Sequence, residues 1–325
     1  MIRSRAPSLW RYREALPIDD DASIISFQEG FTPLLHVRFG SRSVRIKQDQ
    51  LLPTGSYKDR GAAVLVSKTK ELGIREVVED SSGNAGSSIA AYCAAAGIRC
   101  HIFVPEATSP AKTRQIEAYG ARLHKIPGNR EDCARAAKIA AESMYYASHV
   151  WNPFFLHGTK TFAYEICEQM GWRVPDTVIL PVGNGTLLLG AWIGFRNLRK
   201  AGITSSLPRL IAVQAQNCAP LARAFHAKSG DIACIETTKT IAEGIAIARP
   251  ARGAQILEAV RDSHGDFITV DEHEIVQAHQ EMAHRGFFIE PTAAACIAGV
   301  KKYLPLSPPD EDIVSVFTGH GLKAG

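Results

Sequence analysis

The sequence lacks the features that mark membrane, nucleic-acid-binding and secreted proteins. No apolar segment of its 325 residues is long enough to cross a bilayer, and its 37 Lys and Arg residues are nearly balanced by 33 Asp and Glu residues. The seven cysteines include no C-x-x-C pair, and the basic start of the chain lacks the apolar core of a secretory signal. We therefore expect a cytoplasmic protein with reduced thiols and without a membrane, nucleic-acid or metal partner.

The chain does have enough apolar residues, 46% of the total, to bury a large core. Short segments that are predicted to be strands, among them 76–79, 100–104 and 176–182, alternate with segments that are predicted to be helices. The last of these strands is almost continuously apolar, which is typical of a parallel strand buried on both faces. This alternation predicts an α/β protein.

One lysine stands among turn-forming residues, directly before an apolar helical run. Residues 53–61 are Pro-Thr-Gly-Ser-Tyr-Lys-Asp-Arg-Gly, and Ser56 or Asp59 could cap the helix that follows. A lysine held in a partly dry site has a lowered pKa, so that its amine can attack a carbonyl group. We interpret Lys58 as a Schiff-base lysine. The plainer alternative is an exposed lysine at the start of a helix.

Three polar turns follow predicted strands, at the positions where open α/β sheets bind their ligands. The first is Ser-Ser-Gly-Asn-Ala-Gly at 81–86, and the third begins at Thr318. The second, at 183–186, leads into an apolar helix, whose first N–H groups and positive dipole end could bind a phosphate monoester. Its glycine spacing lacks the third glycine of the dinucleotide fingerprint, which disfavours a nicotinamide-dependent oxidoreductase.

Together these segments resemble the fold-type II pyridoxal-phosphate enzymes, and among them most the threonine synthase family. The resemblance runs from about residue 9 to the end of the chain and is carried by 53–61, 81–86, 181–185, 290–292 and 318–323. It implies a two-domain tryptophan synthase beta-like fold, in which helices flank parallel twisted sheets. Residues 1–80 and 150–325 would form the larger, cofactor-binding domain, and residues 81–149 a smaller inserted α/β domain. The resemblance also implies a homodimer.

The resemblance further implies a role for each matching residue. Lys58 would bind pyridoxal 5'-phosphate as a Schiff base and move protons at the substrate carbons, and Asn84 would bond the phenolic oxygen of the cofactor. Thr318 would face the pyridine nitrogen. The residues that would bind the cofactor phosphate form one turn and are Gly183, Asn184, Gly185 and Thr186. The residues expected to bind the substrate are Ser81, Ser82, Gly83, Asn84, His149 and Lys160.

Several of these residues also have plainer interpretations. Asn84 could hold its own turn through its side chain, Thr318 could cap a local backbone group, and Glu290 before Pro291 could be an ordinary acid at a helix start. His320, between two glycines, has no assigned role. His101 lies in an apolar predicted strand and is more typical of a satisfied core residue than of a ligand.

The family's reaction converts O-phospho-L-homoserine and water to L-threonine and phosphate, and the chain departs from the family at the substrate side. Where the family has an asparagine, a serine and an arginine, this chain has His149, Val150 and Phe155. Loss of a bidentate arginine should weaken binding of a phosphorylated substrate by about 2–5 kcal/mol, unless Lys160 and His149 replace it. The zinc-binding segment of some relatives is also missing, since no cysteine precedes Cys93.

These departures leave alternatives open. A serine or threonine dehydratase, or a β-replacement enzyme acting on a less anionic substrate, would be compatible with the altered pocket. A non-catalytic binding or regulatory protein that kept the fold is the alternative from another class.

Overall fold

The computed structural model describes residues 2–128, 130–229, 232 and 237–323, which divide into two compact units. The first unit comprises Met1–Phe31 and Leu52–Thr161, and the second comprises Thr32–Leu51 and Phe162–Ala324. These limits differ from the predicted domain boundaries, because the lysine helix belongs to the first unit. Within the described residues, no helix is both long enough and apolar enough to cross a membrane.

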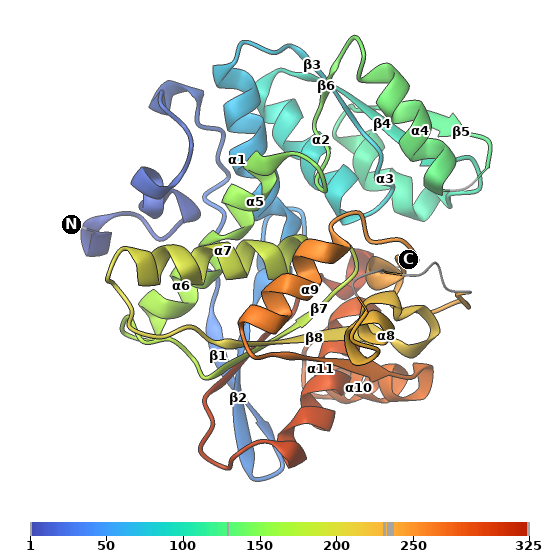
Figure 1. The fold of residues 1–325 in the computed structure, drawn as a ribbon. Helices are drawn as coiled ribbons and strands as arrows, with labels where there is room; N and C mark the ends of the chain where they lie inside the picture. Colours follow the sequence, from blue (N-terminus) through green and yellow to red (C-terminus); the bar gives the residue numbers. More distant parts are fainter. Residues whose placement is uncertain (1, 129, 230–231, 233–236, 324–325) are drawn as a thin grey trace. The chain divides into compact units, whose positions relative to one another are not determined.

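The first unit is built around a parallel sheet with the strand order β5-β4-β3-β6 (Figure 1). Its strands are β3 (Glu76–Glu79), β4 (Arg99–Pro105), β5 (Arg122–Ile126) and β6 (Tyr145–Tyr146). Its helices are α1 (Lys58–Glu71), α2 (Asn84–Ala96), α3 (Pro110–Ala118), α4 (Arg130–Ala140) and α5 (Pro153–Thr159). The strand-helix alternation predicted from the sequence is therefore present in this unit.

Helices cover both faces of this sheet. Val77 of β3 packs in a cluster with the buried residues of α1 and α2, whereas its neighbour Val78 packs with Phe103 and with Ala137 of α4. Successive residues of a strand point to opposite faces, so both faces of β3 must be apolar. This packing explains why α1 belongs to the first unit, since residues 62–66 are fully buried in the cluster they share with α2.

The second unit contains a six-stranded sheet with the order β1-β2-β10-β7-β8-β9, in which only the β1–β2 pair is antiparallel. Its strands are β1 (Leu34–Phe39), β2 (Arg42–Lys47), β7 (Thr177–Pro181), β8 (Arg209–Ala215), β9 (Asp266–Val270) and β10 (Ile313–Val316). Its helices are α6 (Thr161–Gln169), α7 (Thr186–Lys200), α8 (Pro220–His226), α9 (Gly253–Asp262), α10 (Glu272–His284) and α11 (Pro291–Tyr303). Every residue of β7 is buried, as its apolar sequence predicts.

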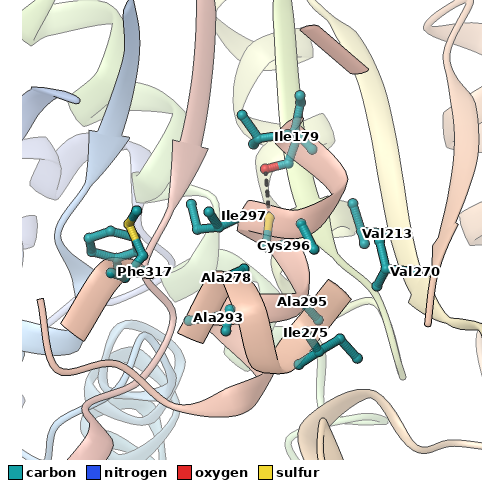
Figure 2. Close-up of a cluster of buried hydrophobic side chains, with 14 of the residues drawn as sticks. Ile179, Val213, Val270, Ile275, Ala278, Ala293, Ala295, Cys296, Ile297 and Phe317 are labelled. Atoms are coloured by element: carbon teal, nitrogen blue, oxygen red, sulfur yellow. Dashed lines mark hydrogen bonds between the residues drawn. The ribbon is translucent and has the colours of Figure 1, made fainter. Parts of the chain in front are cut away.

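Small residues allow α11 to pack closely on this sheet. Figure 2 shows the thiol of Cys296 directed at the main-chain carbonyl of Ile179 in β7, and the Sγ–O distance is 3.4 Å. A Cβ atom on Gly299 would lie 2.4 Å from Cγ2 of Val213 in β8, so only glycine permits this approach. Burial raises the pKa of the Cys296 thiol to about 12, and the group therefore stays protonated and packs as an apolar side chain.

Candidate cofactor and substrate site

In the first unit, the turn before α1 is held by the carboxylate of Asp59. This buried group accepts hydrogen bonds from the backbone N–H of Thr54 at 2.7 Å, from the Thr54 hydroxyl at 2.6 Å and from the Ser88 hydroxyl at 2.5 Å. The N-cap residue of α1 is Tyr57, so neither Ser56 nor Asp59 is the cap. Asp59, the residue after Lys58, instead links the turn before α1 to the second turn of α2.

A second helix packs closely on the lysine helix. A Cβ atom on Gly61 of α1 would lie 2.4 Å from Cδ1 of Phe155, and one on Gly158 of α5 would lie 1.9 Å from the carbonyl oxygen of Arg60. The Phe155 ring is fully buried, and its centroid lies 5.7 Å from Nζ of Lys58. Phe155, at the position where the resemblance implies an arginine, is therefore a packing residue that contacts α1.

The predicted substrate turn at 81–83 leads into α2, which begins at Asn84. A Cβ atom on Gly86 would lie 1.9 Å from the carbonyl oxygen of Ser81, so the turn can fold over the helix start only because residue 86 is glycine. Ser81 also accepts a hydrogen bond from the backbone N–H of Gly83 at 3.3 Å. The first N–H groups of α2 lack partners within the helix and form its positive end.

Sequence analysis missed one buried acid in this unit. Glu79, the last residue of β3, is fully buried, and its Oε1 lies 2.5 Å from Nδ1 of His149. Burial raises the pKa of Glu79 to about 8, and burial together with the positive charge of Lys58 holds the pKa of His149 well below its usual value. The signal in the sequence is the acidic pair Glu79-Asp80 directly before the serine turn.

Lys160, which is also predicted to bind the substrate, lies at the end of α5. It is 3% exposed, and its Nζ lies 2.8 Å from Nδ1 of His157. Burial lowers the pKa of Lys160 to about 8, and burial together with the charge of Lys160 lowers the pKa of His157 to about 4. His157 therefore stays neutral near pH 7 and accepts a hydrogen bond from the lysine.

In the second unit, the predicted phosphate turn connects β7 to α7, which begins at Thr186. Gly185 has the left-handed conformation, with φ of 73°, and a Cβ atom there would lie 2.3 Å from Cδ1 of Ile256. A Cβ atom on Gly183 would lie 2.9 Å from Cγ1 of Ile247. Both positions require glycine, so the backbone of the turn is the surface that a ligand would meet.

Thr318 follows β10 in the same unit and is 3% exposed. Its Oγ1 is buried and has no hydrogen-bond partner within the described part of the chain. A buried hydroxyl without a partner is unfavourable, so such a group indicates a missing ligand or water. The alternative in which Thr318 caps a backbone group of the described structure is not supported.

The glycine after Thr318 makes room for Glu290. A Cβ atom on Gly319 would lie 1.9 Å from Oε2 of Glu290, and the Glu290 N–H donates to the Gly319 carbonyl at 2.9 Å. His320 accepts a hydrogen bond from the Leu322 N–H at 3.2 Å, which stabilises the turn.

In the first unit, His101 contacts both Glu76 and His124, as expected of a satisfied core residue.

Comparison with known proteins decides the family. The family model described as "Pyridoxal-phosphate dependent enzyme" matches residues 25–319. The chain belongs to this family. The threonine synthase of Methanocaldococcus jannaschii is 39% identical over 99% of this chain and 82% of the relative, and that of Methanosarcina acetivorans is 34% identical with the same coverage. The predicted membership, with its threonine synthase branch and its cofactor pyridoxal 5'-phosphate, is thereby confirmed.

Solved structures of this family have the same fold as this chain. Maize serine racemase is similar with a TM-score of 0.80 and 21% identity, and the match covers 98% of this chain and 94% of that one. Threonine deaminase isoform 2 from Solanum lycopersicum is similar with a TM-score of 0.79 and 20% identity, and the match covers 97% and 86%. The predicted fold class is therefore confirmed.

Proposed function

We propose that this pyridoxal-phosphate enzyme is a threonine synthase that converts O-phospho-L-homoserine and water to L-threonine and phosphate. The observation that carries the proposal is the similarity to threonine synthases over 99% of the chain. The lysine turn adds support, since Asp59 holds it through three hydrogen bonds next to Lys58.

The described residues fit the cofactor. Lys58 offers a primary amine at the start of α1, the turn from Gly183 to Thr186 offers the backbone donors of a helix start, and Thr318 offers a buried hydroxyl without a partner. We assign them to the carbonyl carbon, the phosphate and the pyridine nitrogen of the cofactor, and we assign Asn84 to its phenolic oxygen. Pyridoxal 5'-phosphate, when bound, supplies a ring that withdraws electrons from the substrate's α carbon.

The protein's own groups would then bind and orient the substrate. Lys58 would move protons at the substrate carbons, and the donors from Ser81 to Asn84 at the start of α2 would bind its carboxylate. Of the two candidate phosphate partners, Lys160 has the stronger case. Its pKa of about 8 leaves it mostly charged at pH 7, whereas His149 is neutral there and can contribute only a hydrogen bond.

A dehydratase or β-replacement enzyme is the second candidate. Phe155 and Val150 are apolar and have no side-chain donor or charge, so neither could bind a phosphate group. A non-catalytic binding or regulatory protein is the third candidate.

We further propose a homodimer in the cytoplasm, which the resemblance to the family supports. Sedimentation of the cofactor-loaded protein would test the oligomeric state.

The function is tested by mixing cofactor-loaded protein with O-phosphohomoserine and measuring phosphate and threonine. We expect equal amounts of both products, and a loss on the order of 10³-fold or more in Lys58→Ala. Lys70→Ala is the matched control, because Lys70 lies on the same helix and donates to the Ala22 carbonyl at the surface, 3.1 Å away. Phosphate release without threonine would indicate an elimination enzyme. Activity that survives in Lys58→Ala would exclude the proposed role of this lysine.

A further inference from the structure

The end of α5 holds a buried lysine whose partner carries no charge. Lys160 is 3% exposed, and its Nζ lies 2.8 Å from Nδ1 of His157, three residues earlier in the chain. Burial, together with the charge of Lys160, lowers the pKa of His157 to about 4, so the imidazole is neutral at pH 7. Its Nδ1 accepts a hydrogen bond from the lysine, and no carboxylate of the described residues forms an ion pair with Lys160.

The second unit contains a buried lysine with the opposite arrangement. Lys47 and Glu165 are both 0% exposed, and Nζ of the lysine lies 2.8 Å from Oε2 of the glutamate. The same Nζ donates to the Thr32 carbonyl at 2.6 Å and to Oε1 of Gln169 at 2.7 Å. Buried charges in proteins are normally paired. Lys47 has its counter-charge within the chain, whereas Lys160 has a neutral acceptor.

The pKa of Lys160 reflects this difference. Burial lowers it to about 8, so the ammonium is still mostly charged at pH 7. A buried ammonium without a counter-charge is unfavourable, and an anion that accepts a hydrogen bond from it would stabilise the charged form. The side chain therefore has the properties of a cation whose counter-charge comes from a ligand.

The surrounding structure fixes the two side chains. The Lys160 N–H donates to the Leu156 carbonyl at 3.0 Å, and a Cβ atom on Gly158 would lie 1.9 Å from the Arg60 carbonyl oxygen, so this segment packs directly on α1. His157 accepts one of the three N–H groups of the ammonium, which leaves two for the oxygen atoms of a ligand. The imidazole is half-buried, so the pair is open to solvent on its side.

We propose that Lys160 and His157 form a binding site for a phosphate group, in which His157 is a positioning residue that fixes the ammonium without neutralising its charge. Phosphate supplies the missing counter-charge and accepts from the two remaining N–H groups of Nζ. This inference rests on the proposed function for the source of the anion, because that reaction removes a phosphate group from its substrate. The site then orients the substrate's phosphate and receives free phosphate as the product.

The test measures the binding of inorganic phosphate at pH 7 by isothermal titration calorimetry. Cofactor-loaded protein is used, so that the cofactor's own phosphate occupies the turn proposed for it. Lys160→Met should weaken phosphate binding by on the order of tenfold or more. His157→Glu should weaken it to a similar extent, because a carboxylate at this position would pair with Lys160 as Glu165 pairs with Lys47. His157→Gln, which keeps a neutral acceptor, should stay within about threefold of the wild type.

Melting temperatures and kinetics distinguish a missing counter-charge from a damaged fold. Lys160→Met and His157→Glu should melt close to or above the wild-type temperature, since each removes an unpaired buried charge. Lys47→Met is the contrasting control and should melt roughly 5 °C or more below the wild type, because it leaves Glu165 unpaired. With O-phosphohomoserine as substrate, His157→Glu should raise KM more than it lowers kcat.

The outcomes separate the site from the function on which it rests. Wild-type protein that does not bind phosphate, or variants that all bind it as the wild type does, would overturn the site, and threonine formation by that wild type would leave the proposed function intact. Phosphate binding that depends on Lys160, in a protein that forms no threonine, would support the site and overturn the function. If Lys160→Met does not fold, the comparison of His157→Glu with His157→Gln gives the decision.

Discussion

Two parts of the first unit meet at the Phe155 ring but differ in how they compare with the family. The lysine turn and the start of α2 have the expected motifs, and Asp59 joins them through hydrogen bonds to Thr54 and Ser88. The segment 149–160 has an imidazole and two buried apolar residues at the positions where the resemblance implies polar ones. We propose that the groups required by the cofactor are retained, whereas the groups that recognise the substrate have changed.

Placing at position 155 the arginine that the resemblance implies should have the largest effect on stability. Phe155→Arg would place a guanidinium in a fully buried position against Gly61, where the Phe155 ring now packs directly on the helix backbone. We expect a loss of stability of about 3 kcal/mol or more and no gain in activity on O-phosphohomoserine. Urea unfolding and product assays measure the two effects, and Phe155→Leu serves as the control that keeps the site apolar. A stable Phe155→Arg protein with raised activity would show that the ring occupies a binding position.

Removing the Asp59 carboxylate should have the next largest effect. Asp59→Ala leaves three donors from Thr54 and Ser88 without their acceptor in a buried site, which should cost about 3 kcal/mol of unfolding free energy. Cofactor affinity should fall as well, because the position of Lys58 is no longer fixed. Asp19→Ala is the control, since the Asp19 side chain is 92% exposed and contacts Lys68 at the surface. Equal stabilities of the two variants would contradict the anchoring role of Asp59.

The charge of Lys160 should have a smaller effect, on substrate binding, and this effect should depend on pH. The pKa of Lys160 is lowered to about 8, so its charge is present below pH 8 and is lost as the pH rises through this value. The KM for O-phosphohomoserine should therefore rise about tenfold or more above pH 8. Lys160→Arg, which stays charged, should remove this dependence. A pH profile of KM that is the same in both proteins would exclude Lys160 as the phosphate partner.

Much of the fold could be predicted because its signals are local. The unbroken apolar run of β7 and the glycine turn after it indicate a buried strand followed by a helix, and the structure has α7 beginning at Thr186. The start of α5 also has a local signal, since Asn152 and Pro153 form a recognisable helix-start pair. Asn152 accepts from the Phe154 N–H, and α5 begins at Pro153.

The remaining features depend on contacts between distant residues. Glu79 and His149 are separated by 70 positions, and only the chain path through β4, β5 and β6 brings them together. The assignment of α1 to the first unit likewise depends on its burial against α2. The acidic pair at 79–80 is visible in the sequence, but neither contact between distant residues has a local pattern there. Comparison of Glu79 with Glu76 makes the same point, since burial raises the pKa of Glu79, whereas hydrogen bonds from Arg99 and His101 lower the pKa of Glu76 on the same strand.

The most direct test of the account is to locate the lysine that carries the cofactor. The holoenzyme would be reduced with borohydride, which converts the carbon-nitrogen double bond to a stable amine, and its peptides would be analysed by mass spectrometry. We expect the cofactor's mass on the peptide that contains Lys58, and its absence from that peptide in Lys58→Ala. Labelling of another lysine, such as Lys160 or Lys47, would contradict the account. The roles proposed for the lysine turn and for the segment 149–160 would then both have to change.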